Sequence, residues 1–513
     1  MRNFLLATLA ALPLSVSGLA VATPPAHAED APTQTLRIAL REDADMLDPT
    51  LARTYVGRIV FAGLCDKLFD IDAKLNVVPQ LATSYEWADP TTLVIKLRQG
   101  VTFQDGEKLD AEAVKYSLMR HLTMAGSSRR AELSSMQSVD VVDPLTIKIH
   151  LKAPNAPFLA ALTDRAGMIV APKVAEKEGK NFALHPVCAG PYKFTERVSQ
   201  DRIVLDRYPD YWNAANEHFA RVIYQPIVDP SVRVANLRAG AIDLSEQIVP
   251  SDVDTVKHDP KLQLSISPGL GYNSVNFNLA SGPRANTPLG QNALVRKAFE
   301  LSIDRQALVQ VVYNGMFPIT AQAVPAASPY YDADVKPPAR DIAKAKALLA
   351  QAHVKTPLVV HLMTPNSPDV QQLAVVMQSM AAEAGFDIKI DSTEFATSLG
   401  AADRGDFEAF LIGWSGRSDP DGNLYSFMHT GAPLNYAHYS NKQVDAWLDQ
   451  ARAATDVATR RTIYGKIAAQ NEADLPIMYL YSPSIIVGMT KKLSGFQPVP
   501  DGMIRLTGMK LAK

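Results

Sequence analysis

Apolar and polar residues alternate along several short stretches in the first half of the chain. Residues 35–40 (TLRIAL), 92–97 (TLVIKL) and 145–151 (LTIKIHL) carry apolar side chains at about every second position. This period is typical of β-strands that bury one face. Asp110 precedes a stretch of helical period and can cap a helix over residues 111–121. The pattern therefore predicts a first half in which strands predominate and a helix packs among them.

The second half of the chain alternates between strand and helix patterns. Residues 358–363 form an apolar run typical of a buried strand, and residues 368–384 follow with helical spacing up to Gly385. Residues 386–390 predict the next strand. This order is a strand–helix–strand unit, whose two strands are expected to be parallel in one sheet.

A candidate ligand loop follows a further predicted strand over residues 407–414. Helices over about 441–454 and 456–473, and a last strand over about 477–488, complete the predicted order. The segment 413–423 (GWSGRSDPDGN) lies just past the carboxyl end of its strand. Ligands of α/β proteins bind at that edge, because the loops beyond the strands frame a crevice there.

This loop has the beginning of a calcium motif but lacks the rest of it. Asp419, Asp421 and Asn423 match the first three ligand positions of an EF-hand. The sixth and twelfth positions are Leu424 and Thr430, where a calcium loop needs glycine and a bidentate glutamate. We therefore expect no bound metal at this loop.

Motifs for catalysis and for cofactors are also missing. The chain has no HExxH helix and no GxSxG elbow, and its ten histidines are scattered singly. Residues 269–271 (GLG) lack the third glycine of a dinucleotide fingerprint. Two cysteines without a CxxC spacing exclude a zinc ribbon or an iron–sulfur centre. No enzyme activity, catalytic residue, cofactor or metal site is predicted.

The N-terminus has the features of a cleavable secretory signal. Arg2 precedes an apolar run over residues 4–12, and residues 26–28 (AHA) form a small-x-small cleavage site. Cleavage after residue 28 removes one positive charge, so that the net charge moves from −2 to −3. So small a charge on a long chain argues against nucleic acid as a partner. We expect a protein exported to the periplasm.

Seven segments along the chain carry a family resemblance when they are taken together and in order. They are PQLATSYEW (79–87), LRQGVTFQDGEKLDAEAVKYSL (97–118), AGPYKF (189–194), YPDYWN (208–213), LRAGAIDL (237–244), VRKAFELSIDRQAL (295–308) and YSNKQVDAWLDQA (439–451). With them the chain resembles the periplasmic solute-binding proteins of ATP-binding-cassette importers, in extracellular solute-binding protein family five, the dipeptide/oligopeptide/nickel class. The resemblance covers almost the whole mature chain.

The resemblance implies an α/β fold: a two-lobed periplasmic binding protein with a third domain inserted into the first lobe. The implied division is a signal peptide (1–28), lobe I (29–60, 187–272 and 483–513), an inserted domain (61–186) and lobe II (273–482). The implied function is capture of a peptide-like or small organic solute and its delivery to inner-membrane ABC permease subunits. The protein is expected to be a monomer. A secreted hydrolase of peptides or glycosides and a periplasmic chaperone remain as alternatives.

Ligand-binding residues are expected in the loops that border the cleft between the lobes. The candidates are Arg53, Thr54 and Tyr55 on lobe I, Tyr272 and Asn273 at the crossover, and Trp414, Arg417, Asp419 and Asp421 on lobe II. In peptide-binding members an aspartate follows the motif's tryptophan and pairs with the α-amino group of the ligand. Arg417 stands at the position that matches it.

This departure from the family pattern predicts an acidic group on the ligand. A guanidinium offers a planar fork suited to carboxylate or phosphate. Asp419 and Asp421 are expected to hold the Arg417 guanidinium in place, unless one of them caps the following segment. The alternative is that Arg417 pairs with these aspartates and never contacts the ligand.

The two cysteines are expected to form a disulfide. If residues 61–186 are inserted, the chain leaves lobe I just before Cys65 and returns just before Cys188. Both then stand at the base of the insertion, and an oxidising compartment favours their pairing. Two free buried thiols are the alternative.

Overall fold

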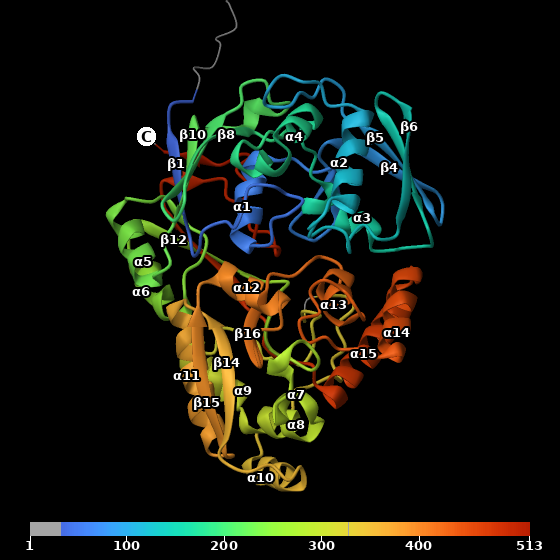
Figure 1. The fold of residues 1–513 in the computed structure, drawn as a ribbon. Helices are drawn as coiled ribbons and strands as arrows, with labels where there is room; N and C mark the ends of the chain where they lie inside the picture. The colour runs from blue at the N-terminus through green and yellow to red at the C-terminus, as the bar shows by residue number, and fades with distance from the viewer. Residues whose placement is uncertain (1–31, 327, 513) are drawn as a thin grey trace, which may run out of the picture. The chain divides into compact units, whose positions relative to one another are not determined.

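The computed structural model describes residues 32–326 and 328–512 (Figure 1). The predicted signal peptide and its cleavage site lie outside these residues. Residues Thr33–Lys513 form one compact unit, and the description below concerns this unit alone. Within the described ranges, no helix combines the length and the hydropathy that a membrane span requires.

A seven-stranded sheet forms the centre of the part that we call lobe I. The strand order is β12-β18-β11-β1-β10-β9-β8, and β1 runs parallel to both of its neighbours. The strands are β1 (Thr35–Leu40), β8 (Tyr192–Val198), β9 (Arg202–Arg207), β10 (Arg221–Pro226), β11 (Leu244–Ser245), β12 (Leu262–Pro268) and β18 (Ser484–Thr490), and the helices are α1 (Tyr55–Leu64), α5 (Pro230–Ala239) and α6 (Val253–His258). The hairpin of β19 (Leu493–Ser494) and β20 (Lys510–Leu511) completes this lobe.

A five-stranded sheet forms the centre of lobe II. Its order is β15-β14-β16-β13-β17. The strands are β13 (Tyr272–Phe277), β14 (Leu358–Pro365), β15 (Phe386–Thr393), β16 (Ala409–Trp414) and β17 (Ile477–Tyr481). The helices are α7 (Pro288–Gln291), α8 (Ala293–Ser302), α9 (Arg305–Tyr313), α10 (Ile342–Gln351), α11 (Pro368–Ala382), α12 (Phe395–Asp403), α13 (Asp421–Met428), α14 (Lys442–Ala453) and α15 (Val457–Asp474).

The predicted strand–helix–strand unit is confirmed within this sheet. β14 pairs with β15 in parallel register, from Leu358 opposite Phe386 to the end of both strands. Along α11, Leu373, Met377 and Ala381 recur four residues apart and are fully buried, so that one face of the helix packs in the core. The parallel pairing brings the carboxyl ends of β14 and β15 to the same edge of the sheet.

A four-stranded antiparallel sheet, β4-β5-β7-β6, forms the inserted domain. Alternation predicted two of these strands, and β5 buries every second residue, with Ile95 opposite Ile147 of β7. The elements are β2 (Phe69–Ile71), β3 (Val77–Pro79), β4 (Ala82–Asp89), β5 (Thr92–Leu97), β6 (Met136–Asp143), β7 (Thr146–Leu151), α2 (Ala111–Thr123), α3 (Phe158–Ala161) and α4 (Pro172–Glu178). Asp110 caps α2, as the sequence predicts, by accepting a hydrogen bond from the backbone nitrogen of Ala113.

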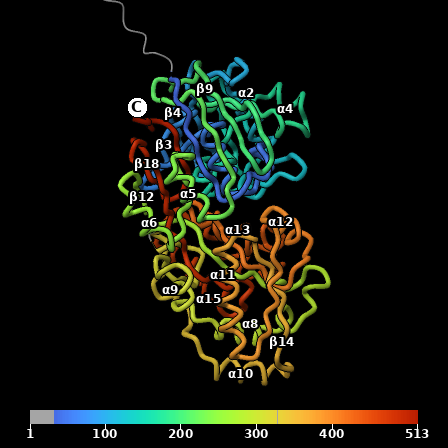
Figure 2. The backbone as a smooth tube through the Cα atoms, turned by 90° about the vertical axis from the view of Figure 1, so that its left-hand side faces the viewer, coloured from blue at the N-terminus to red at the C-terminus, as the bar shows by residue number. Residues whose placement is uncertain are grey.

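One predicted strand is wrong in extent. The stretch 477–488 is two strands, β17 in the sheet of lobe II and β18 in the sheet of lobe I. Pro483 stands between them and has no N–H group to donate to a sheet. In Figure 2, β18 lies beside its partner strand β12 and near α5 and α6. The chain therefore crosses between the lobes here and again between β12 and β13.

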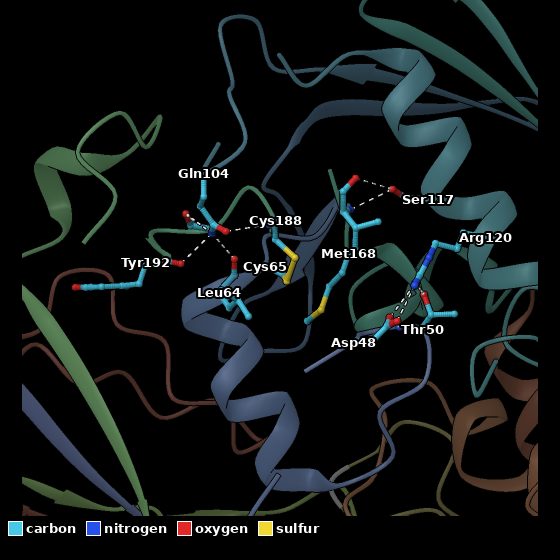
Figure 3. The surroundings of a disulfide bond; sticks show 12 residues. Asp48, Thr50, Leu64, Cys65, Gln104, Ser117, Arg120, Met168, Cys188 and Tyr192 are labelled. Atoms are coloured by element: carbon cyan, nitrogen blue, oxygen red, sulfur yellow. Dashed lines mark hydrogen bonds and ion pairs between the residues drawn. A yellow bond between two sulfur atoms is a disulfide. The ribbon is translucent and has the colours of Figure 1, made fainter. Parts of the chain in front are cut away.

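The predicted disulfide between Cys65 and Cys188 is present, with the two Cα atoms 4.9 Å apart (Figure 3). Gln104 of the inserted domain reinforces the same junction. Its side-chain nitrogen donates hydrogen bonds to the carbonyl oxygens of Leu64 (2.7 Å) and Tyr192 (2.9 Å), and its oxygen accepts one from the backbone nitrogen of Cys188 (2.9 Å). The inserted domain is thus fastened to lobe I where the chain enters and leaves it.

Candidate functional site

A cavity of about 510 Å³ is bordered by lobe I, the inserted domain and lobe II. Its size lies within the range usual for small-molecule sites. The charged residues that line it are Arg53, Arg129, Arg165, Arg417, Arg452, Glu132, Asp164, Asp403, Asp419 and Asp421. In the described part of the chain, no three His, Cys, Asp or Glu side chains come together as a metal site requires.

One wall of the cavity is aromatic. The Trp414 and Phe427 rings meet edge to face at a centroid distance of 4.8 Å, and Tyr272 packs against Phe427 at 6.2 Å. All three residues line the cavity. Such rings offer a large apolar contact area at a small cost in side-chain freedom. This wall suits an apolar portion of a ligand.

The backbone of the 413–423 loop is fixed against the crossover between the lobes. Leu270 and Gly416 form a bridge, and Gly416 has a φ of +82°. A Cβ atom on Gly271 would lie 1.9 Å from the carbonyl oxygen of Trp414, so only glycine allows this approach. The GLG sequence at 269–271 is thus explained by close backbone packing.

Asn423 organises the inside of this loop. Its side-chain oxygen accepts hydrogen bonds from the indole nitrogen of Trp414 (3.0 Å) and from the backbone nitrogen of Arg417 (2.8 Å). Its side-chain nitrogen donates to the carbonyl oxygens of Leu270 and Ala323. The residue is fully buried, so these bonds hold Trp414 and Arg417 in one arrangement.

Arg417 lies at the cavity and reaches the inserted domain. Its guanidinium stacks over Trp414, 4.4 Å from the ring centroid, and its Nε is 2.7 Å from Oδ2 of Asp164. Nη1 donates to the carbonyl oxygen of Gly416, whereas the buried Nη2 has no hydrogen-bond partner. Burial lowers the pKa of Arg417 to about 10, which leaves it charged at neutral pH.

The expectation that Asp419 and Asp421 hold the Arg417 guanidinium is wrong. Asp419 instead accepts hydrogen bonds from Arg460 at 2.6 and 2.8 Å, and Asp421 accepts them from Arg452 at 2.7 and 2.9 Å. Both arginines come from the helices α14 and α15, which the spacing within the loop could not reveal. Asp419 also accepts a hydrogen bond from the backbone nitrogen of Asp421, the first residue of α13, but the N-cap of this helix is Pro420 and not an aspartate.

The carboxylate that does contact Arg417 was not predicted. Asp164 is buried, lies in the inserted domain, and is shared with Arg58, whose Nη2 is 3.0 Å from Oδ2, and with the neighbouring Arg165. Two charged residues inside the apolar stretch 158–171 (FLAALTDRAGMIVA) were the available signal. Charged side chains in such a run are buried only when they are paired or bind something.

The other predicted site residues fall into two groups. Arg53, Tyr55, Tyr272 and Trp414 line the cavity, as do Arg417, Asp419 and Asp421, whereas Thr54 and Asn273 do not. Thr54 caps α1 by accepting a hydrogen bond from the backbone nitrogen of Gly57. Arg53 reaches across to lobe II, where it pairs with Asp403 and donates to the hydroxyl of Tyr436 at 2.7 Å.

Comparison with known proteins gives a consistent set of relatives. The family model for bacterial extracellular solute-binding proteins, family 5 (middle region), matches residues 76–435. The glutathione-binding protein GsiB of Pectobacterium atrosepticum is 29% identical over 505 residues, which is 95% of each chain. GsiB of Escherichia coli O157:H7 is 28% identical over 477 residues, 90% of this chain and 92% of that one.

Two solved structures extend the comparison to bound ligands. The periplasmic binding protein DppA of Helicobacter pylori, in complex with the peptide STSA, is 25% identical with a TM-score of 0.86, over 94% of this chain and 99% of that one. AgaA of A. tumefaciens R10, in complex with agropinic acid, is 26% identical with a TM-score of 0.85, over 93% and 99%. The fold of this chain is therefore similar to that of these two proteins over nearly their whole length.

Proposed function

We propose that this chain, which belongs to family 5 of the bacterial extracellular solute-binding proteins, captures a peptide-like or small organic solute that carries an acidic group. The family resemblance and the two-lobed fold predicted from the sequence are confirmed by the comparisons. The chain is accordingly the substrate-binding protein of an ATP-binding-cassette importer. In this proposal it works in the periplasm as a monomer, delivers its solute to inner-membrane permease subunits, and catalyses no reaction.

The surroundings of Arg417 are the main evidence for an acidic group on the solute. The guanidinium is buried at the cavity, is held in place by Trp414 and the loop backbone, and has one nitrogen without a hydrogen-bond partner. A buried donor of this kind costs free energy until an acceptor reaches it. A carboxylate or phosphate of the solute would supply that acceptor with a complementary charge.

The relatives support the same chemical range. Their names state that they bind glutathione, a peptide and agropinic acid. These are peptides and an organic acid, and all are small enough for a site enclosed between two lobes. The substitution of an arginine where peptide-binding members carry an aspartate favours the acidic end of this range.

Direct contacts between lobe II and the rest of the protein support enclosure of the solute. The backbone nitrogen of Ala156 in the inserted domain donates to the carbonyl oxygen of Arg452 (2.8 Å), and Arg58 of lobe I donates to the hydroxyl of Ser415 (3.2 Å). The two crossovers between the lobes are the natural hinge, because only they connect the two sheets. Opening at this hinge would admit the solute, and solute contacts on both sides would favour closure.

The domain limits belong to the same proposal. They are lobe I (29–60, 187–272 and 483–513), the inserted domain (61–186) and lobe II (273–482), and the membership of the strands in the three larger sheets supports this division. The first limit falls within α1, which continues to Leu64 in the core of lobe I.

Calorimetric titration tests the proposal directly. The purified protein is titrated with a panel of dipeptides, tripeptides, opines and small organic acids, and mass spectrometry is applied to any molecule released on unfolding. We expect one saturable acidic solute that is recovered unchanged. Conversion of the solute at enzymatic rates, or binding only of basic peptides, would contradict the proposal.

A further inference from the structure

At the cavity, four ion pairs each join one arginine to one carboxylate, so that the two charges of each pair cancel. Arg53 pairs with Asp403, Arg452 with Asp421, Arg460 with Asp419, and Arg129 with Glu132. Each of these four carboxylates lines the cavity, and no lysine or histidine does. These eight residues therefore contribute no net charge to the site.

Three arginines remain, and they share one carboxylate. Asp164 lies 2.7 Å from Nε of Arg417, 3.0 Å from Nη2 of Arg58 and 4.0 Å from Nε of Arg165. Arg58, Arg165 and Asp164 are each less than a tenth exposed. The lining of the cavity holds five arginines and five carboxylates. Arg58 and Arg460 do not line the cavity but pair with lining carboxylates, and with them seven guanidinium groups stand against five carboxylates, an excess of two positive charges around the cavity.

A second carboxylate that acts on Arg58 does not remove this excess. Asp501 is close enough to Arg58 to influence it, but Asp501 accepts hydrogen bonds from Arg505 at 2.9 and 3.0 Å. Arg505 also binds Asp70, which in turn pairs with Lys67. These four residues, Arg505 and Lys67 with Asp501 and Asp70, carry two positive and two negative charges, so that their net charge is zero.

Polar atoms in the excess group point to a missing partner. Nη2 of Arg417, Nε of Arg165 and Nε of the neighbouring Arg129 are buried and have no hydrogen-bond partner. Oδ2 of Asp164 and Oε2 of Glu132 also lack a hydrogen bond, but both carboxylates are already in ion pairs with arginines. Arg129 and Arg165 are 3% and 1% exposed, and both line the cavity. Buried charges in proteins are compensated, because an unpaired charge in a poorly solvated site is costly.

We propose that the solute bears a net charge of −2 and places its negative groups against Arg165 and Arg417, with an apolar body along the aromatic wall. This inference rests on the proposed function and narrows its substrate class. Two carboxylates, or one phosphate monoester, supply the required charge. The aromatic wall of Tyr272, Trp414 and Phe427 lies in the same cavity and would hold the apolar body.

Three small-molecule ligands test whether the charge of the solute, and not its shape, determines binding. Benzylsuccinate has two carboxylates and an aromatic ring, and 4-phenylbutyrate is the same molecule without one carboxylate. Benzyl phosphate carries its two charges on a single phosphate. Calorimetric titration of the full mature chain should give a dissociation constant for benzylsuccinate at least about thirtyfold lower than for 4-phenylbutyrate, the effect of leaving one buried charge unpaired.

Two variants each remove one charge from the excess group. In Arg165→Met and in Arg417→Gln, the preference for benzylsuccinate over 4-phenylbutyrate should fall by at least about tenfold. Arg165 also donates to the carbonyl oxygens of Ala52 and Thr54, so Arg417→Gln is the variant with less effect on folding. Arg238→Gln is the matched control, because Arg238 is an exposed arginine outside the cavity, and it should keep the full preference.

The results distinguish this inference from the function on which it rests. If benzyl phosphate binds tightly as well as benzylsuccinate, the site recognises a charge of −2 in either chemical form. If benzylsuccinate binds tightly and benzyl phosphate does not, the site is specific for two carboxylates. Equal affinity for benzylsuccinate and 4-phenylbutyrate, or a preference that both variants keep, would overturn the inference. If only neutral or zwitterionic peptides bind, the inference fails and solute capture stands. If neither these probes nor the earlier panel bind, both fail.

Discussion

Replacing Asp164 by asparagine should be among the most destabilising conservative changes in this protein. The substitution keeps the shape of the side chain and removes the one negative charge that Arg58, Arg165 and Arg417 share. Burial alone would raise the pKa of Asp164, but the charges of Arg417, Arg58 and Arg165 hold it well below its usual range. A carboxyl with a lowered pKa stabilises the folded state above its unfolded pKa, so the full effect is present at neutral pH.

The magnitude follows from burial and from the position of the partners. Removing one partner of a buried ion pair costs about 3–5 kcal/mol, because the remaining charge is left without compensation. Arg58 belongs to lobe I and Arg165 to the inserted domain, on the same side of the cleft as Asp164. Their contacts with Asp164 do not depend on closure of lobe II, so the loss should appear in the ligand-free protein as well.

Urea unfolding at pH 7 measures this loss, with Asp403→Asn as the control. Asp403 also pairs with an arginine, but its side chain is 41% exposed, and such pairs contribute about 0–1 kcal/mol. We expect the free energy of unfolding to fall about 3 kcal/mol further in Asp164→Asn than in Asp403→Asn. Equal losses in the two variants would refute the reasoning that Asp164 compensates a buried excess of positive charge.

Three further predictions concern the ligand, the cross-link and pH. Once a solute is identified, Arg417→Ala should weaken its binding by about 2 kcal/mol or more, and unchanged affinity in calorimetry would contradict its contact with the solute. Cys65→Ala with Cys188→Ala should cost about 4–5 kcal/mol in urea unfolding, because the bond closes a loop with a sequence separation of 123, and thiol titration of the unfolded, unreduced parent should detect no free thiol. Burial raises the pKa of Asp66 to about 7, so its ionised carboxyl should destabilise the fold in full above that pH, and this penalty should decline as the pH falls from about 7 towards the unfolded pKa of about 4. The stability difference between the parent and Asp66→Asn should therefore change between pH 8 and pH 5, and a constant difference would argue against this pKa.

Local order in this protein could largely be predicted from the sequence, because it depends on neighbouring residues. The alternation in residues 92–97 and the helical spacing in residues 368–384 were sufficient to place β5 and α11. The stretch 477–488 is largely apolar on both sides of its central Ser-Pro-Ser, and the assignment of its two halves to different sheets shows that Pro483 divides it. Membership of a sheet is a long-range property that hydrophobic pattern does not contain.

The candidate site was predictable where one loop forms it and not where several parts of the chain meet. Position at or just past the end of a strand was enough to select Trp414 and Arg417, both of which line the cavity. Asp164 lies 253 positions before Arg417, in a segment without regular pattern, and their contact exists only because the inserted domain faces lobe II. The arginines that bind Asp419 and Asp421 were missed for the same reason, because helical periodicity does not say which loop a helix faces.

Both ends of the described chain belong to lobe I. β1 and the final hairpin of β19 and β20 contribute to one hydrophobic core, and the C-terminus lies near β1 in Figure 1. In the hinge motion proposed above, a pair of fluorescent proteins fused to the two termini would therefore keep a constant separation and would not report binding. A biosensor needs one reporter within lobe II, for instance in the turn after α10. For the same reason, the protein can be attached to a surface by its C-terminus without restraining the lobe that moves.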